Sequence, residues 1–552
     1  MRRAAIGRLA LIAAVGFASE AGAVAVEAAN ASGAFGLYPA PSFRLVTGGC
    51  KDCATLRQAL WYFRAETIAV PKPGLPVASF APGVSAFDDI RAWAATRSPG
   101  AAIDYPPLVW VESPQVVRGA RLSADGTRLE IGSAGLAVKP EPKIPLNRSY
   151  YNAASIAYLQ DRALTVRGTL DGGELTMRTV WPEAFALGGT APQTHALPAA
   201  SSPGLALRAL MRDSPRGGAQ GEFVARTLWQ RDAAASDWSG KPVLALMVNG
   251  AQGDDDEAHA GHFAIVTGRV APDGRLGDWL VNNYYSLDVE SEKGIIAAPL
   301  PLDNYLADLN SGQNWYRPTY MVVLVLRDAR AADLVQSALN RVYNQFYRHQ
   351  LVYYHPSDNC ASISVDTLRA LGWPIPARGA SNRLLAWISF PVVAIKERSL
   401  GKAKVAFDYL YTDRARLLPA VALEEAFDSI LTLVRGELPE GSGPLARMIA
   451  EDVAAIAYVR VPQFPSNRAF GDAPAVSVAE YKSRVPDDPA LAQIVPVPPR
   501  PFPEALRDPD LLEHEWRPSD YATLVWGVLS IVGIPVLLWR AWVWRKRRRS
   551  NH

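Results

Sequence analysis

Residues 353–372 read YYHPSDNCASISVDTLRALG, and this stretch decides how we interpret the fold of the chain. The segment 361–371 keeps helical spacing of its apolar residues, and Gly372 with a proline two residues beyond is a typical helix stop. Three short polar residues can cap the start of this helix: Ser357, Asp358 or Asn359. The pattern therefore predicts that Cys360 lies in the first turn of a helix.

Only three cysteines occur in the chain, Cys50, Cys53 and Cys360. In an oxidising compartment an odd count leaves one thiol without a partner. Cys50 and Cys53 are close enough to pair, so Cys360 is predicted to be the free thiol. A redox role for the CxxC pair is the alternative, but the βαβ pattern of a thioredoxin-like domain is missing around it, which favours a structural disulfide.

A histidine precedes a predicted strand well before Cys360. The residues from His262 to Val270 are predicted to form a strand. Asp273-Gly274 is a turn signal, and the segment 279–285 is the predicted partner strand. A helix start and a nearby imidazole both stabilise a thiolate. We therefore predict that His262 acts on Cys360 if the helix packs on this sheet. His259 competes for this role, since it also lies at the strand entry.

A third polar group is needed to orient the imidazole. Asn282 and Asn283 lie on the partner strand, and the period-2 alternation of a strand points only one of them inward. We favour Asn283, because a bend at the strand mouth would place it beside His262.

The acidic loop 254–257 together with His259 and His262 suggests a metal site as an alternative. Residues three apart on a strand face opposite sides of the sheet, so the two histidines would not share one ion there. A charge run in a loop is usually solvated. The prediction is therefore that no metal and no cofactor is bound.

The stretch Gly261 to Val266, GHFAIV, followed by a second strand and then by Asn359-Cys360 and Leu368-Arg369 on a helix, resembles the circularly permuted papain-like enzymes. It is similar to lecithin–retinol acyltransferase relatives of the NlpC/P60 superfamily, and to the periplasmic domains of the lipoprotein intramolecular transacylase family. The match spans roughly residues 241–372. The resemblance implies that Cys360 is the nucleophile, His262 the general base and a polar residue of the following strand the orienting group.

Both ends of the chain carry targeting patterns. Residues 1–23 have a basic start, a short apolar run and a small-residue exit, which is typical of a secretory signal peptide cleaved after Ala23. Tyr521 to Trp539 carries no charge and is long enough to cross a bilayer, and six basic residues follow from Arg540 onward. The patterns predict a single-pass protein of a bacterial inner membrane with its bulk in the periplasm.

The charge of the chain changes when these ends are set aside. The formal +3 includes three Arg and one Glu in the signal and six basic residues after the span, so the exported body carries −5. A nucleic-acid partner requires a basic surface and is not indicated. The predicted partners are the lipid bilayer and an envelope substrate.

The predicted fold class is α+β, with a permuted papain-like core of antiparallel sheet and helices, a preceding small β-rich module and a C-terminal membrane helix. The expected organisation is: signal peptide 1–23; CxxC-containing helical segment 24–100; β-rich module 101–200; papain-like catalytic domain 201–440; irregular Pro-rich stalk 441–520; transmembrane helix 521–544; basic cytoplasmic tail 545–552.

Two functions are expected from this organisation. The first is a cysteine hydrolase or acyltransferase acting on an amide or ester of a lipoprotein, a phospholipid or a cell-wall peptide. The second is a catalytically silent envelope assembly or binding protein that uses the same core as a scaffold.

Overall fold

The computed structural model describes residues 24–98, 100–141, 150–198, 202–211, 222–232, 237–250, 261–287, 297–315, 317–465 and 502–508, with Ser483 and a few single residues between Val525 and Lys546. This part of the chain is mixed α+β, as predicted. The predicted signal peptide, the acidic loop, His259 and most of the predicted membrane span lie outside it. Within it, no helix has both the length and the apolar character that crossing a membrane requires.

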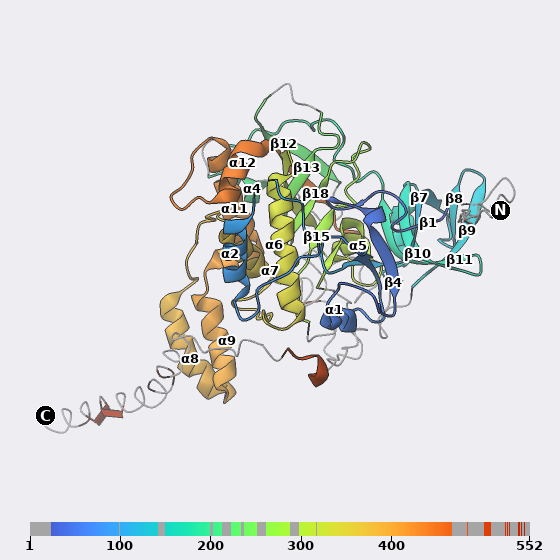
Figure 1. Cartoon of the computed structure of the whole chain (residues 1–552). Helices are drawn as coiled ribbons and strands as arrows, with labels where there is room; N and C mark the ends of the chain where they lie inside the picture. The colour runs from blue at the N-terminus through green and yellow to red at the C-terminus, as the bar shows by residue number, and fades with distance from the viewer. Residues whose placement is uncertain are drawn as a thin grey trace, which may run out of the picture.

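The largest sheet has seven antiparallel strands in the order β12-β18-β17-β13-β14-β15-β16 (Figure 1). Its strands are β12 (Val224–Gln230), β13 (Pro242–Asn249), β14 (His262–Arg269), β15 (Leu280–Asn282), β16 (Pro299–Pro301), β17 (Thr319–Leu326) and β18 (Val453–Val461). The inner strands are buried almost throughout, and they read as nearly continuous apolar runs because no face of them meets water.

Helices cover this sheet near its centre. They are α4 (Pro203–Met211), α6 (Arg330–Tyr347), α7 (Cys360–Ala370), α11 (Pro419–Val434) and α12 (Pro444–Asp452). Helices α6 and α11 contact β13 and β14, and α7 packs on β14. The predicted cysteine helix therefore lies on the predicted histidine strand.

A second sheet forms the β-rich part of the chain, on the right of Figure 1. Its order is β1-β7-β10-β11-β9-β8, from β1 (Glu27–Ala28), β7 (Gln115–Leu122), β8 (Arg128–Ile131), β9 (Ala134–Pro140), β10 (Leu164–Asp171) and β11 (Glu174–Pro182). The turns at Gly126 and Gly172-Gly173 have positive φ, as glycine readily adopts. In both turns the glycine follows an aspartate, and Asp-Gly is a common hairpin turn sequence.

Buried ion pairs join this sheet to the rest of the molecule. Arg167 Nε lies 2.7 Å from Asp303 Oδ2 at the start of α5 (Leu302–Ala307). Arg178 Nε lies 2.9 Å from Asp308 Oδ2, and its Nη1 lies 3.0 Å from Glu66 Oε2. The β-rich part is therefore held to the rest of the molecule by paired charges that are largely buried.

The segment 24–100 is not mainly helical, which corrects the prediction. Besides α1 (Arg57–Tyr62) and α2 (Ala86–Thr96), it contains β4 (Phe43–Thr47) and β5 (Thr67–Pro71), which form a three-stranded sheet with β6 (Val109–Glu112). Short strand pairs β2 (Ala34–Phe35) and β3 (Tyr38–Pro39) precede them. Strand β4 pairs with β5 across the helix α1, and β5 pairs with β6 beyond the segment, so local periodicity does not reveal these strands.

The predicted disulfide between Cys50 and Cys53 is present, with a Cα–Cα distance of 5.8 Å. It lies in the loop between β4 and α1, and Arg44 Nη2 lies 2.8 Å from Cys50 Sγ and 3.1 Å from Cys53 Sγ. Cys360 is the free cysteine. The bridge closes a loop with a sequence separation of only three residues.

We expect replacement of both Cys50 and Cys53 by serine to lower the free energy of unfolding by about 2 kcal/mol, since a short loop gains little from closure. Denaturant unfolding of the oxidised wild type and the double variant measures this loss, and alkylation of Cys360 is the control that should not change. A double variant that keeps its stability but loses activity would instead indicate a redox role.

The predicted stalk 441–520 is wrong in its first part. Helix α12 and strand β18 occupy 444–461, and β18 lies between β12 and β17 with all nine residues buried. Its pairing partners precede it by more than a hundred residues, so only tertiary contacts reveal its place in the sheet. Further along, Phe502 stacks on Tyr62 and Asp508 pairs with Arg348, so residues 502–508 also pack on the body.

Two helices, α8 (Arg383–Glu397) and α9 (Leu400–Tyr411), form a hairpin that extends from the body at the lower left of Figure 1. They have a small apolar core of their own, made of Ala386, Phe390, Ala394, Ala403 and Phe407. The short α10 (Arg414–Leu417) leads back to α11.

Candidate active site

Cys360 is the first residue of α7, and its position is set by a capping box. Asn359 Oδ1 accepts hydrogen bonds from the N–H groups of Ala361 (2.8 Å) and Ser362 (3.1 Å), while Asn359 N–H donates to Ser362 Oγ (2.7 Å). Of the three residues that could cap the helix, Asn359 does so. The reciprocal bonds hold the thiol at the helix start, and its residue is 6% exposed.

His262 is the first residue of β14, and its ring is tied to Asn283. His262 Nε2 lies 2.6 Å from Asn283 Oδ1. Because an amide oxygen only accepts hydrogen bonds, Nε2 carries the hydrogen and Nδ1 is left as the basic nitrogen. This is the arrangement that a general base requires.

The structure distinguishes the two asparagines. Asn282 Nδ2 donates to Gln336 Oε1 (2.9 Å) and to the carbonyl oxygen of Ile265 (3.2 Å), so its side chain holds the sheet to α6. Asn283 lies one residue beyond the end of β15, where the strand alternation no longer applies. It is therefore Asn283 that reaches His262.

The thiol lies against the beginning of β14. The backbone N–H of Phe263, the residue after His262, acts on the Cys360 sulfur and lowers the pKa of the thiol. This N–H is near the strand end, and the pairing of β14 with β15 starts only at Ile265. The nucleophile candidate at the start of α7 and the base candidate at the start of β14 thus belong to two elements that pack on each other, although they are 98 residues apart in the sequence.

Burial dominates the electrostatics of the pair. It raises the pKa of the Cys360 thiol, and the Phe263 N–H, the Tyr353 hydroxyl and the Arg317 charge oppose this only in part. Burial, with the Arg317 charge, lowers the pKa of His262 to about 3. The resting pair is therefore a neutral thiol and a neutral imidazole. This corrects the expectation of a thiolate stabilised by imidazolium, because two charges here would lose their hydration.

Tyr353 is a site residue that the sequence interpretation missed. Its hydroxyl lies 3.4 Å from the Cys360 backbone nitrogen and also lowers the pKa of the thiol. Its ring contacts Tyr285 and His355, with centroids 5.6 Å and 5.0 Å away. The sequence does contain a signal for it: two tyrosines, a histidine and a proline precede the three residues that could cap the helix.

A chain of buried polar groups lies behind His262. Tyr305, whose ring centroid is 6.3 Å from that of His262, donates from its hydroxyl to Asn249 Oδ1 (2.5 Å). Asn249 pairs with His262 in the strand register, and its Nδ2 donates to Thr319 Oγ1 (2.7 Å). These bonds and the strand register connect the ends of β13, β14 and β17 next to His262. The three ends are separated in the sequence and meet only in the folded sheet.

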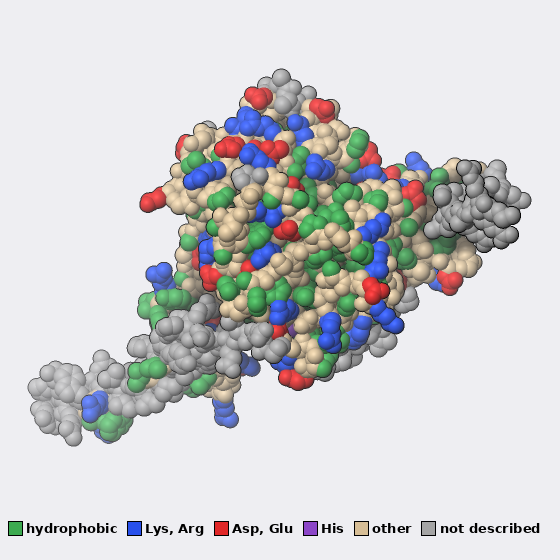
Figure 2. Space-filling model, in the orientation of Figure 1, with side chains coloured by type: hydrophobic (Ala, Val, Ile, Leu, Met, Phe, Trp, Pro, Cys, Tyr) green, Lys and Arg blue, Asp and Glu red, His purple; other side chains and the backbone are tan. Residues whose placement is uncertain are grey.

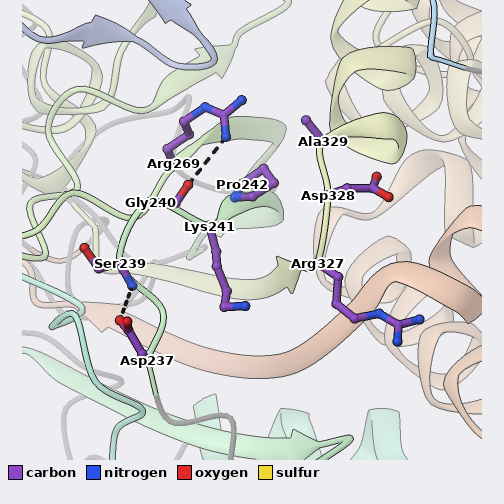
Figure 3. A pocket seen from close by; sticks show the side chains of 9 residues that line it. All are labelled: Asp237, Ser239, Gly240, Lys241, Pro242, Arg269, Arg327, Asp328 and Ala329. Carbon is purple, nitrogen blue, oxygen red and sulfur yellow. Dashed lines mark hydrogen bonds between the residues drawn. The ribbon is translucent and has the colours of Figure 1, made fainter.

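A separate hollow of about 590 Å³ lies at the other end of the central strands (Figure 3). Lys241, Arg269 and Arg327 line it together with Asp237 and Asp328. Strand β14 runs from His262 to Arg269, seven steps of about 3.3 Å or roughly 23 Å. This hollow is therefore not part of the Cys360 site.

The proposed metal alternative gains no support from the described residues, which contain no group of three or more His, Cys, Asp or Glu side chains suited to hold an ion. The acidic loop and His259, on which that alternative depends, lie outside them.

Comparison of the chain with protein-family models, with curated proteins and with solved structures finds no match. Its function therefore has to be inferred from the side chains around Cys360, since function resides in sites rather than in folds.

Proposed function

We propose that the protein is a membrane-anchored, extracytoplasmic cysteine hydrolase or acyltransferase that attacks an amide or ester carbonyl with Cys360. One observation carries the proposal: His262 Nε2 is held by Asn283 Oδ1 at 2.6 Å at the start of β14, the strand on which the helix that begins with the free thiol packs. Nucleophile, base and orienting group in this relation are the recurring arrangement of covalent catalysis.

The proposed reaction uses the Cys360 sulfur as nucleophile and His262 Nδ1 as the proton acceptor. As the Cys360 sulfur attacks the carbonyl carbon, its proton passes to His262 Nδ1. The resulting imidazolium then protonates the leaving amine or alcohol, and a thioester remains on Cys360. Water, or an amine or hydroxyl of an acceptor, attacks this thioester with His262 again taking the proton, and the thiol is restored.

The developing oxyanion has two donors at hand. The Cys360 backbone N–H donates to the Tyr353 hydroxyl over 3.4 Å, so a carbonyl oxygen that lies beside this pair, about 2.9 Å from each atom, would accept from both groups. Asn283 acts as a positioning residue, because it orients His262 without touching the substrate.

The chain order supports a permuted papain-like core. The histidine strand β14 precedes the cysteine helix α7, and α7 packs on that antiparallel sheet. The predicted signal peptide and membrane span place this core outside the cytoplasm and close to a bilayer. Lipoproteins, phospholipids and cell-wall peptides remain the candidate substrates.

The second candidate function is a silent scaffold. The burial of Cys360 and His262, each 6% exposed, and the raised pKa of the thiol favour it. A scaffold needs no reactive sulfur, so the two functions differ in whether Cys360 becomes acylated.

The proposal is tested by trapping the acyl-enzyme. Native protein incubated with p-nitrophenyl acetate should gain one acetyl group on the peptide that contains Cys360, and neutral hydroxylamine should remove it, as it removes a thioester. Intact-protein and peptide mass spectrometry measure both steps, with unfolded protein as the matched control. Acetylation confined to other residues, or seen only after unfolding, would leave the scaffold function as the better explanation.

A further inference from the structure

The α8–α9 hairpin exposes an apolar stripe that the proposed reaction does not use. Leu384, Ile388, Val392 and Ile395 follow helical spacing along α8 and are between 51% and 72% exposed. The buried core of the hairpin is made of other residues, so this stripe is not needed to hold α8 and α9 together. An exposed apolar surface of this kind indicates a binding site for another molecule or a membrane.

The charge of the hairpin indicates what this contact is. Residues 383–411 contain five basic and two acidic side chains, a net charge of +3, in an exported body of net −5. Where atoms of this projection are visible in Figure 2, to the left of the view, hydrophobic and basic side chains lie next to each other. Apolar residues flanked by Lys and Arg are the composition of helices that lie in an anionic lipid interface.

Exposed aromatic side chains on the hairpin are a further feature of helices that bind a lipid interface. Tyr409 and Tyr411 on α9 are 40% and 43% exposed. Amphipathic rings of this kind concentrate at the boundary between headgroups and acyl chains.

The hairpin also touches the predicted anchor. Gly527, within the uncharged segment 521–539, packs so closely on the Phe390 ring of α8 that a side chain at that position would overlap it. Where this segment enters a bilayer, the hairpin beside it meets the same leaflet.

The other side of the hairpin contacts the cysteine loop. Tyr354 donates from its hydroxyl to Asp408 Oδ2 (2.9 Å), and Lys404 Nζ lies 2.6 Å from the same oxygen. Tyr354 follows the site residue Tyr353 directly. A lipid-bound hairpin would therefore hold the Cys360 loop close to the membrane surface.

We propose that the α8–α9 hairpin is a lipid-docking element: its exposed stripe enters an anionic leaflet beside the C-terminal segment and holds the Cys360 site at that surface. The docking itself does not depend on the proposed function. Only its consequence for the substrate does: the substrate would be an acyl group presented by a membrane-anchored donor.

Fluorescence quenching tests the docking without any catalysis. The full-length chain carrying Cys360→Ser and Ile388→Cys is labelled with the fluorophore NBD and placed in vesicles of phosphatidylethanolamine and phosphatidylglycerol. Lipids spin-labelled near the headgroup should quench the label about twofold or more, as expected for a shallowly inserted helix. The same is expected for Val392→Cys. Asp171→Cys, at the exposed β10–β11 turn far from the hairpin in Figure 1, is the matched control and should stay unquenched.

Quenching at position 388 no stronger than at position 171 would overturn the docking. A blue-shifted emission that lipid spin labels do not quench, but that grows with the protein-to-lipid ratio, would overturn it in favour of a second copy of the chain. Because the thiol is absent in these variants, the outcome is independent of the acyl-enzyme test.

Discussion

Replacing Cys360 with alanine is expected to reduce acyl transfer by on the order of 10⁴-fold or more, because no covalent intermediate can form without the sulfur. The side chain is small and lies at the first position of a capped helix, so the variant should remain folded. The measurement is turnover of p-nitrophenyl acetate by the purified protein, paired with complementation in cells that lack the wild-type copy.

The matched control for this variant is Thr367→Val. Thr367 is buried in the same helix, and its hydroxyl donates to the carbonyl oxygen of Ile363 (2.7 Å) within α7. It should keep turnover, which separates loss of the nucleophile from disturbance of the helix. A Cys360→Ala protein that is folded and still complements would contradict the enzyme proposal and support the scaffold.

Replacing His262 with alanine is expected to lower turnover by roughly 10²–10⁴-fold, the usual contribution of a general base. The loss should appear in kcat, since His262 acts on the proton of Cys360 and not on substrate binding. His259→Ala, the competing candidate, should have a much smaller effect. Equal losses in the two variants would contradict the assignment.

The pH dependence of thiol labelling gives the same variant a second readout. The lowered pKa of His262, about 3, leaves the imidazole neutral across the neutral range, so no imidazolium holds the thiol ionised. Iodoacetamide labelling of folded wild type should therefore rise with pH toward the raised pKa of the thiol, more slowly at neutral pH than for an ordinary cysteine. His262→Ala should leave the midpoint of this curve in place while turnover falls.

A clear shift of the labelling midpoint to higher pH in His262→Ala would show that wild type holds a thiolate–imidazolium pair instead. This outcome would support the expectation drawn from the sequence, in which the imidazole stabilises the thiolate. The contrast matters because the two resting states predict different reactivity toward alkylating agents.

Several features of the site were accessible from the sequence because they are local. The Asn-Cys order at a helix start, the stop at Gly372 and the strand beginning at His262 are set by neighbouring residues. The pairing of Cys50 with Cys53 followed from spacing and compartment. Capping, periodicity and short loop closure all act within a few residues, so a single sequence shows them.

Other features depend on chain segments that meet only in three dimensions. Strand β18 was assigned to a stalk because its partners β12 and β17 are distant in the sequence. Tyr353 was overlooked because its contact with the Cys360 backbone arises from a loop, for which no periodic pattern exists.

By itself, the sequence determined which residues could do chemistry: a free thiol at a helix start, a histidine at a strand start and an asparagine on the next strand. Only the tertiary structure decided that Asn283 and not Asn282 holds the histidine, and that the resting pair is neutral. The reason is physical. Residue type and spacing are properties of the chain, whereas side-chain direction beyond a strand end and the loss of hydration on burial depend on what the folded protein packs around each group.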